Sequence, residues 1–283
     1  MMPPPTPKRE EKTPATRPIA TSRGHADVAG PAGMHEASGP AHRILAGMAD
    51  ALLDELVSAP QASALLLDID GVLAPIVEDP WAARVPDPTR AELARLTERY
   101  ALVACITGRP HDDAARVVGV PGIEIVGEHG LELVAEAAEW IDRLADFAAG
   151  VDWPAERKRL TLSFHFRRAG DEAAARAYLD RVAGWARESG LVTRYGRKVL
   201  EVRPPLAADK GTAVRALLER AGLERALYAG DDTTDLDAFA ALAGLELGIR
   251  IAVDSAEAPP GLREAADLVV DGPAGMLRLL RQL

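Results

Sequence analysis

The sequence has one cysteine, no long basic run, and no apolar run of the roughly 20 residues that cross a bilayer. One cysteine excludes an intrachain disulfide, and Cys105, inside the apolar run 101–106, is expected to be a small core residue rather than a catalytic thiol. The formal charge of -10 argues against a nucleic-acid or anionic-membrane partner. Because the first residues also lack the apolar segment of a signal peptide, we expect a soluble, cytoplasmic protein.

The pattern of apolar residues changes three times along the chain. Residues 1–41 have no apolar periodicity and are rich in Pro, Thr, Ala, Gly and charge, which is typical of a disordered tail. Short apolar strands alternate with helices over 42–131 and again over 204–283, which indicates an α/β core with a parallel sheet. Residues 132–203 mix helices, a half-buried strand and a hairpin, and we interpret them as an inserted α+β cap.

The predicted elements follow from apolar spacing and turn residues. An amphipathic helix is expected from residue 42 to about 57. Further helices are predicted at 89–99, 112–118, about 140–147, 173–187, 212–220 and 274–280, and strands at 64–67, 101–106, 123–126, 160–166, 191–195, 198–202, 226–229, 249–253 and 267–270.

The chain is organised around one short run, Ala64-Leu65-Leu66-Leu67, because two carboxylates follow it directly in Asp68-Ile69-Asp70-Gly71. A short apolar run bounded by a turn is typical of a buried parallel strand, and ligands bind at the carboxyl edge of such sheets. Two carboxylates there need a counter-charge, most simply Mg²⁺, because repulsion and desolvation would otherwise neutralise one of them. A plain polar turn is the alternative, and the motifs that follow argue against it.

Polar groups suited to a phosphate follow at two later positions. Thr107, Gly108 and Arg109 come directly after the strand 101–106, where a hydroxyl, a glycine and a guanidinium suit an oxyanion. Lys210 lies at the start of a predicted helix, where a cation opposes the helix dipole, so an electrostatic function explains it better than local stability.

A second acidic cluster follows the strand 226–229. Asp231, Asp232 and Asp235 lie there in the run Gly230-Asp231-Asp232-Thr233-Thr234-Asp235. Helix capping explains one or two of these aspartates, whereas the cluster as a whole is typical of a site for a hard cation.

Together these motifs predict phosphoryl transfer. Asp68 is assigned as the nucleophile that forms an aspartyl-phosphate, and Asp70 as the general acid and base. Mg²⁺ would bridge Asp68, the backbone carbonyl of Asp70 and Asp231, with Asp232 and Asp235 as further ligands or as residues behind the ligands. Thr107 and Lys210 would hold the phosphoryl oxygens.

Other polar residues are candidates for substrate binding, each with solvated surface or a structural contact as the alternative. In the core these are Gly108, Arg109, Glu128 and His129, and in the predicted cap they are Lys158, His165, Arg167 and Glu201.

The ordered motifs D-I-D-G-V-L, I-T-G-R, D-K-G and G-D-D-T-T-D resemble those of the haloacid dehalogenase-like phosphohydrolases over about residues 62–283. The resemblance implies a Rossmann-like core with the strand of the first motif in its centre, and a cap inserted between the second and third motifs.

More narrowly, the stretches 68–77, G-E-H-G-L at 127–131, H-F-R at 165–167 and E-V-R-P at 201–204 resemble the trehalose-6-phosphate phosphatases. That implies Mg²⁺-dependent hydrolysis of trehalose 6-phosphate to trehalose and phosphate, a step of trehalose biosynthesis, with cap residues holding the sugar. Ile69, Val72, Phe166 and Leu236 depart from residues common in that family, and none of them replaces a catalytic group.

Three alternatives stay open. The substrate could be another sugar or glycoside phosphate, such as glucosylglycerol phosphate, because spacing does not place the specificity side chains of the cap. A phosphosugar mutase shares the aspartyl-phosphate step but must exclude water from the intermediate. A sugar-phosphate sensor usually lacks the nucleophile or the acid/base, and both Asp68 and Asp70 are present here. The sequence does not indicate the oligomeric state.

Overall fold

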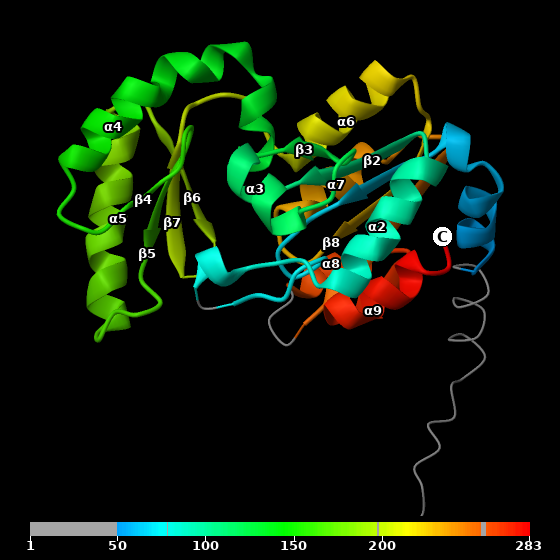
Figure 1. Cartoon of the computed structure of the whole chain (residues 1–283). Coiled ribbons are helices and arrows are strands. Elements are labelled where there is room, and N and C mark those ends of the chain that lie inside the picture. The colour runs from blue at the N-terminus through cyan, green and yellow to red at the C-terminus, as the bar shows by residue number, and fades with distance from the viewer. Residues whose placement is uncertain (1–49, 78, 197, 256–258) are drawn as a thin grey trace, which may run out of the picture. The chain divides into compact units, whose positions relative to one another are not determined.

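The computed structural model describes residues 50–77, 79–196, 198–255 and 259–283, all within one compact unit of the chain. Two separate sheets organise these residues, one of six strands and one of four (Figure 1). The tail predicted for 1–41 and the first part of the helix predicted from residue 42 lie outside the described residues.

The six-stranded sheet is parallel, and its strand order is β10-β9-β8-β1-β2-β3. Its strands are β1 (Ala64–Leu67), β2 (Leu102–Ile106), β3 (Glu124–Val126), β8 (Arg225–Gly230), β9 (Leu247–Asp254) and β10 (Leu268–Asp271). Strand β1 lies between β2 and β8, with Leu65 opposite both Val103 and Leu227. Since the three strands point the same way, the residues that follow them meet at one edge of the sheet.

Helices cover both faces of this sheet, which explains why β1 is apolar at every position. Leu65 and Leu67 pack into one hydrophobic cluster, whereas Ala64 and Leu66 pack into another on the opposite face. The first face is covered by residues 50–58, which are helical, and by α2 (Asp87–Arg99), α3 (His111–Val118) and α9 (Gly272–Leu280). The second face is covered by α6 (Lys210–Ala221), α7 (Asp235–Ala241) and α8 (Pro260–Ala265).

The four-stranded sheet is antiparallel, with the order β4-β5-β7-β6, and its strands lie between β3 and α6 in the chain. The strands are β4 (Glu156–Arg157), β5 (Leu162–His165), β6 (Val192–Gly196) and β7 (Val199–Arg203). Helices α4 (Ile141–Ala149) and α5 (Glu172–Glu188) pack on it around Phe164 and Leu200. Short 3-10 helices complete the chain: η1 (Pro60–Ala62), η2 (Pro80–Ala82), η3 (Glu128–Leu133) and η4 (Ala135–Trp140).

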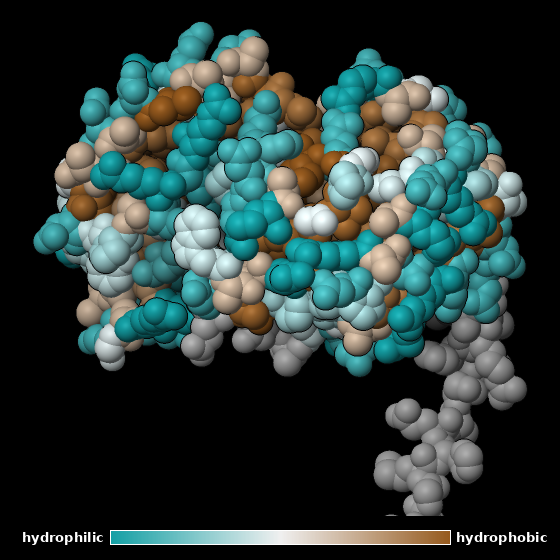
Figure 2. Space-filling view, in the orientation of Figure 1, coloured by the Kyte–Doolittle hydropathy of each residue, from teal (hydrophilic) through white to brown (hydrophobic). Residues whose placement is uncertain are grey.

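Hydrophilic residues cover most of the face seen in Figure 2, and hydrophobic residues show there in smaller areas. Most large apolar side chains are instead buried in the clusters that line the two sheets. Among the described residues, no helix combines the length and the apolar character that a membrane span requires.

The predicted fold class, a parallel α/β core with an antiparallel α+β insertion, is confirmed. Several local details differ from the prediction, and two of them have a clear reason. Helix α6 begins at Lys210 rather than at Thr212, because Asp209 caps it: the Asp209 carboxylate accepts a hydrogen bond from Thr212 N at 2.7 Å, and Thr212 Oγ1 accepts one from Asp209 N at 2.9 Å. Strand β4 was not predicted, since two residues are too short to show an alternating pattern.

Cys105 lies in β2 and is fully buried, as the sequence predicts, and burial raises the pKa of its thiol. We therefore expect the folded protein to resist a thiol-specific reagent such as DTNB and to release about one equivalent of colour only when guanidinium chloride unfolds it. Ser189→Cys, at an exposed position just after α5, is the matched control and should react at once. Rapid labelling of the folded wild-type protein would contradict the buried position.

Candidate active site

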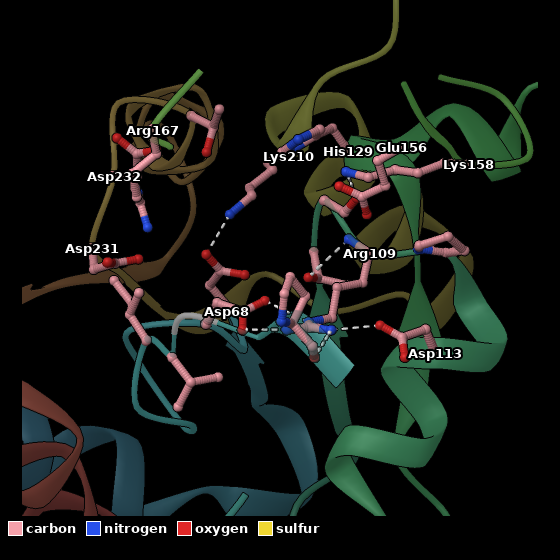
Figure 3. A pocket seen from close by; sticks show the side chains of 18 residues that line it. Asp68, Arg109, Asp113, His129, Glu156, Lys158, Arg167, Lys210, Asp231 and Asp232 are labelled. Atoms are coloured by element: carbon pink, nitrogen blue, oxygen red, sulfur yellow. Dashed lines mark hydrogen bonds and ion pairs between the residues drawn. The ribbon is translucent and has the colours of Figure 1, made fainter. Parts of the chain in front are cut away.

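The polar residues that follow β1, β2 and β8 line one cavity of about 300 Å³, together with residues of the four-stranded sheet (Figure 3). Asp68 and Asp70 come from the loop after β1, and Thr107 from the loop after β2. Lys210 comes from the first turn of α6, and Asp231 from the end of β8. The structure thus brings together four segments that the sequence separates widely.

The centre of the site is a buried ion-pair chain. Lys210 Nζ donates to Asp68 Oδ2 and to Asp235 Oδ1, each at 2.7 Å, and the lysine side chain is 1% exposed. Burial alone would lower the pKa of Lys210, but the carboxylates of Asp235 and Asp68 outweigh burial and hold this pKa above its usual value. The lysine is therefore a fixed positive charge on the floor of the cavity.

Asp235 belongs to this chain of ion pairs but does not line the cavity. Its Oδ1 accepts from Lys210 and from the Tyr228 hydroxyl, and its Oδ2 accepts from the backbone N–H groups of Asp231 and Asp232 at 2.9 Å. Four donors occupy the lone-pair positions of one carboxylate. Asp235 thus positions Lys210 and the loop after β8 rather than facing a ligand.

The carboxylates of Asp68 and Asp231 lie close together. Oxygens of Asp68, Asp231 and Asp235 lie within 4.8 Å of one another. Burial, followed by the charges of its neighbours, raises the pKa of Asp231 to about 8, and burial raises the pKa of Asp68 to about 7 although Lys210 opposes the shift. Such a carboxylate pair suits a hard divalent cation, which would restore the ionised form of both groups.

The loop after β1 approaches Asp231 very closely at Gly71. A Cβ atom at this position would lie 2.1 Å from Asp231 Oδ2, and the backbone has a φ of +82°. Any other residue would therefore clash with the carboxylate and strain the loop.

Asp70 does not point to Lys210 but pairs with Arg109. Arg109 Nε donates to Asp70 Oδ2 at 2.6 Å, and Nη2 donates to Asp70 Oδ1 at 2.8 Å. The same guanidinium also donates to the carboxylate of Asp113 in the first turn of α3. Two parallel hydrogen bonds of this kind fix the orientation of the Asp70 carboxylate.

The loop after β2 is braced by His129. The backbone N–H of His129 donates to Thr107 O at 2.9 Å, and a Cβ atom on Gly108 would lie 2.6 Å from His129 Nε2. Burial, together with the charges of Lys210 and Lys158, lowers the pKa of His129 to about 4 although Glu201 opposes the shift. The imidazole is therefore neutral at pH 7, and it lines the cavity beside Thr107.

Of the residues predicted in the cap, Lys158 and Arg167 line the cavity, and Lys158 Nζ donates to Gly108 O at 2.8 Å. The other two do not line it. His165 lines a neighbouring cavity, where its Nε2 lies 2.7 Å from Glu156 Oε2. Glu201 lies behind His129, with 3.8 Å between Glu201 Oε1 and His129 Nε2.

Glu128 was predicted to bind substrate, yet the structure places it away from the cavity. Its side chain is fully buried, and both carboxylate oxygens accept from Leu160 N, at 2.9 and 2.8 Å. Glu128 thus links the core loop after β3 to the segment that carries Lys158.

Three residues of the site were missed at the level of sequence. Asp113 lies four residues after Arg109, a spacing that places it beside the loop and could have indicated the pair. Glu156 lines the cavity and pairs with His165, and no motif marks it. The Tyr228 hydroxyl reaches Asp235 from inside an apolar strand, where the pattern predicts only a core residue.

Solved structures have folds similar to that of this chain. The chain resembles a trehalose-6-phosphate phosphatase related protein with a TM-score of 0.62 and 26% identity, covering 77% of this chain and 95% of the other. It also resembles a haloacid dehalogenase-like hydrolase from Bacteroides thetaiotaomicron with a TM-score of 0.53 and 17% identity, covering 77% and 98%. At 17% identity the second likeness shows the fold alone, so the chain has the fold of a haloacid dehalogenase-like hydrolase.

The sequence comparisons indicate a narrower family than the solved structures do. A trehalose-phosphatase family model matches residues 66–153 and 154–271, so the chain belongs to the trehalose-phosphatase family. A trehalose-phosphate phosphatase of Mycobacterium avium (strain 104) is 37% identical over 227 residues, covering 72% of this chain and 56% of the relative. The chain spans about half the length of the trehalose-phosphate phosphatases of Mycobacterium avium and Mycobacterium marinum that it matches, 56% and 51%.

The ion-pair chain predicts a large asymmetry between two lysines. Lys210→Met leaves Asp68 and Asp235 buried without a counter-charge, so the free energy of unfolding should fall by about 3–5 kcal/mol. Lys198→Met, which breaks an exposed pair with Glu172, should cost less than about 1 kcal/mol. Urea unfolding of both variants, with EDTA present so that metal binding does not contribute, measures the difference. Equal losses in the two variants would show that the buried pair does not stabilise the fold.

Proposed function

We propose that this chain is a Mg²⁺-dependent phosphatase that hydrolyses trehalose 6-phosphate to trehalose and phosphate through an aspartyl-phosphate on Asp68. The observation that carries the proposal is the position of the Asp68 carboxylate, at the carboxyl end of the central strand and 2.7 Å from Lys210, in a chain of the trehalose-phosphatase family. The proposed substrate is taken from the relatives, because those of Mycobacterium avium and Mycobacterium marinum are trehalose-phosphate phosphatases.

In the first step a carboxylate oxygen of Asp68 attacks phosphorus, and the bond from phosphorus to the sugar oxygen breaks. Lys210 holds a positive charge beside the attacking group, which lessens its repulsion from the phosphate. The Thr107 hydroxyl lines the same cavity and can donate to a phosphoryl oxygen. The departing sugar oxygen takes a proton from Asp70.

In the second step Asp70 accepts a proton from water, which attacks phosphorus and breaks the bond to Asp68. Phosphate leaves, and Asp68 returns as a carboxylate, so protons and bonds balance over the cycle. In the structure Arg109 holds both oxygens of the Asp70 side chain. Each turnover therefore requires the Asp70 side chain to turn from Arg109 towards the sugar oxygen.

The metal would be held by the carboxylates of Asp68 and Asp231 and by the backbone carbonyl of Asp70, with Asp232 near them. When bound, Mg²⁺ supplies positive charge that offsets the phosphate and the two carboxylates. The burial of these carboxylates supports this assignment, as do the oxygens of Asp68, Asp231 and Asp235 that lie within 4.8 Å of one another.

Phosphate release tests the reaction, the metal and the substrate together. Trehalose 6-phosphate with Mg²⁺ should be hydrolysed strongly in preference to glucose 6-phosphate, sucrose 6-phosphate and glucosylglycerol phosphate, and EDTA should abolish the activity. Metal-dependent hydrolysis of another compound on the panel would keep the reaction and reject the substrate. No release from any compound would contradict a phosphatase.

The two aspartates of the first motif should differ in what they lose. Asp68→Asn removes the nucleophile and should abolish turnover, whereas Asp70→Asn should lower kcat by roughly 10²-fold or more. Asp146→Asn, at an exposed position in α4, is the matched control and should leave kcat unchanged. Near-normal hydrolysis by metal-loaded Asp68→Asn would reject the assignment of the nucleophile.

A further inference from the structure

A second and larger cavity of about 910 Å³ lies against the cavity of Asp68. The two share walls formed by Pro80, Pro110 and Lys158. Pockets for small ligands span about 300–1,000 Å³, so the smaller cavity suits a phosphate and part of one sugar ring, and the larger has room for a second ring. A ligand with two sugar rings, which is the substrate class of the proposed function, would extend into it.

One wall of the larger cavity carries apolar side chains that face water. They belong to the segment after the first motif, where the exposed Val77 and Trp81 line this cavity and the exposed Ile76 lines the smaller one. Trp81 lines the larger cavity and, at 75% exposed, is the most exposed large apolar side chain among the described residues. A single exposed apolar residue is ordinary, but an apolar group beside a polar cavity is typical of a binding surface.

The structure holds Trp81 in place although the ring faces water. The Asp79 carboxylate accepts from Trp81 N at 3.0 Å, and Arg109 Nη1 donates to Pro80 O at 3.2 Å. The guanidinium carbon of Arg116 lies 5.6 Å from the centre of the Trp81 ring.

Arg116 is itself fixed, because it pairs with Asp113, which also accepts from Arg109. The ring is thus connected through Arg116, Asp113 and Arg109 to Asp70, the assigned acid and base.

We propose that Trp81 is the platform on which the sugar ring farther from the phosphate stacks, which rests on the proposed function. One face of a pyranose ring presents C–H groups, and these pack on the large, electron-rich face of an indole. The hydroxyl groups at the ring edge need hydrogen-bond donors. Arg157 and Arg168 line the same cavity, and neither has an ion-pair partner within the part of the chain that the structure describes.

The platform should contribute to binding only when the ligand has a second ring. Binding is measured by calorimetry in the Asp68→Asn background, where substrate is not consumed, with trehalose 6-phosphate and with glucose 6-phosphate, which lacks the outer ring. Trp81→Ala should weaken the binding of trehalose 6-phosphate by about tenfold and leave the binding of glucose 6-phosphate unchanged, because the lost contact is one aromatic face. Trp81→Phe, which keeps an aromatic face, should restore most of the affinity.

Trp185→Ala is the matched control, since Trp185 is exposed on α5 and does not line either cavity. It should leave both affinities unchanged. The proposal is overturned if Trp81→Ala weakens both ligands alike, weakens neither, or if the background protein does not bind trehalose 6-phosphate. Failure of the proposed function is a separate result: the wild-type enzyme would release no phosphate from trehalose 6-phosphate, whatever the affinities.

Discussion

The structure of the site depends on one buried ammonium group. Lys210 lies between Asp68 and Asp235 and is almost inaccessible to water, so its charge is balanced only by these two carboxylates. Removing either partner would leave a buried charge uncompensated, which is among the costliest changes a protein interior can undergo. The position of β1, the start of α6 and the loop after β8 are therefore coupled through three side chains.

This coupling explains why a lysine is tolerated at a helix N-terminus, where the dipole disfavours it. Asp209, the residue before it, caps the helix with both halves of a capping box, which stabilises the first turn without help from Lys210. The lysine side chain is then free to reach the cavity. Asp209 and Thr212 thus stabilise the start of α6, and Lys210 at that start pairs with residues far away in the sequence.

Much of the core could be predicted, because it depends on patterns within a few residues. The apolar run before Asp68 and the polar groups after it are adjacent in sequence, and parallel strands bring such ends to one edge. Partnerships across the chain could not be predicted in this way. Lys210 and Asp68 are 142 residues apart, and nothing near Glu128 in the sequence indicates that its carboxylate turns to Leu160 rather than to the cavity.

The same limit applies to residues whose surroundings decide their function. Tyr228 has the pattern of a core residue, and only the fold brings its hydroxyl to Asp235. Trp81 has no periodic neighbours, and only the fold sets its ring beside a cavity. Apolar spacing predicts which side chains are buried, but it does not predict which buried or exposed side chain meets a given polar group.

In the site without ligand, Arg109 and Asp70 form an ion pair with each other. A guanidinium that holds two oxygens of one carboxylate can exchange them for another anion. A phosphate that enters beside Arg109 is such an anion. Binding of the ligand and release of the Asp70 side chain would then be a single exchange of partners on Arg109. Without substrate, Asp70 would then stay bound to Arg109. Binding of the substrate would free Asp70 to act as the acid and base.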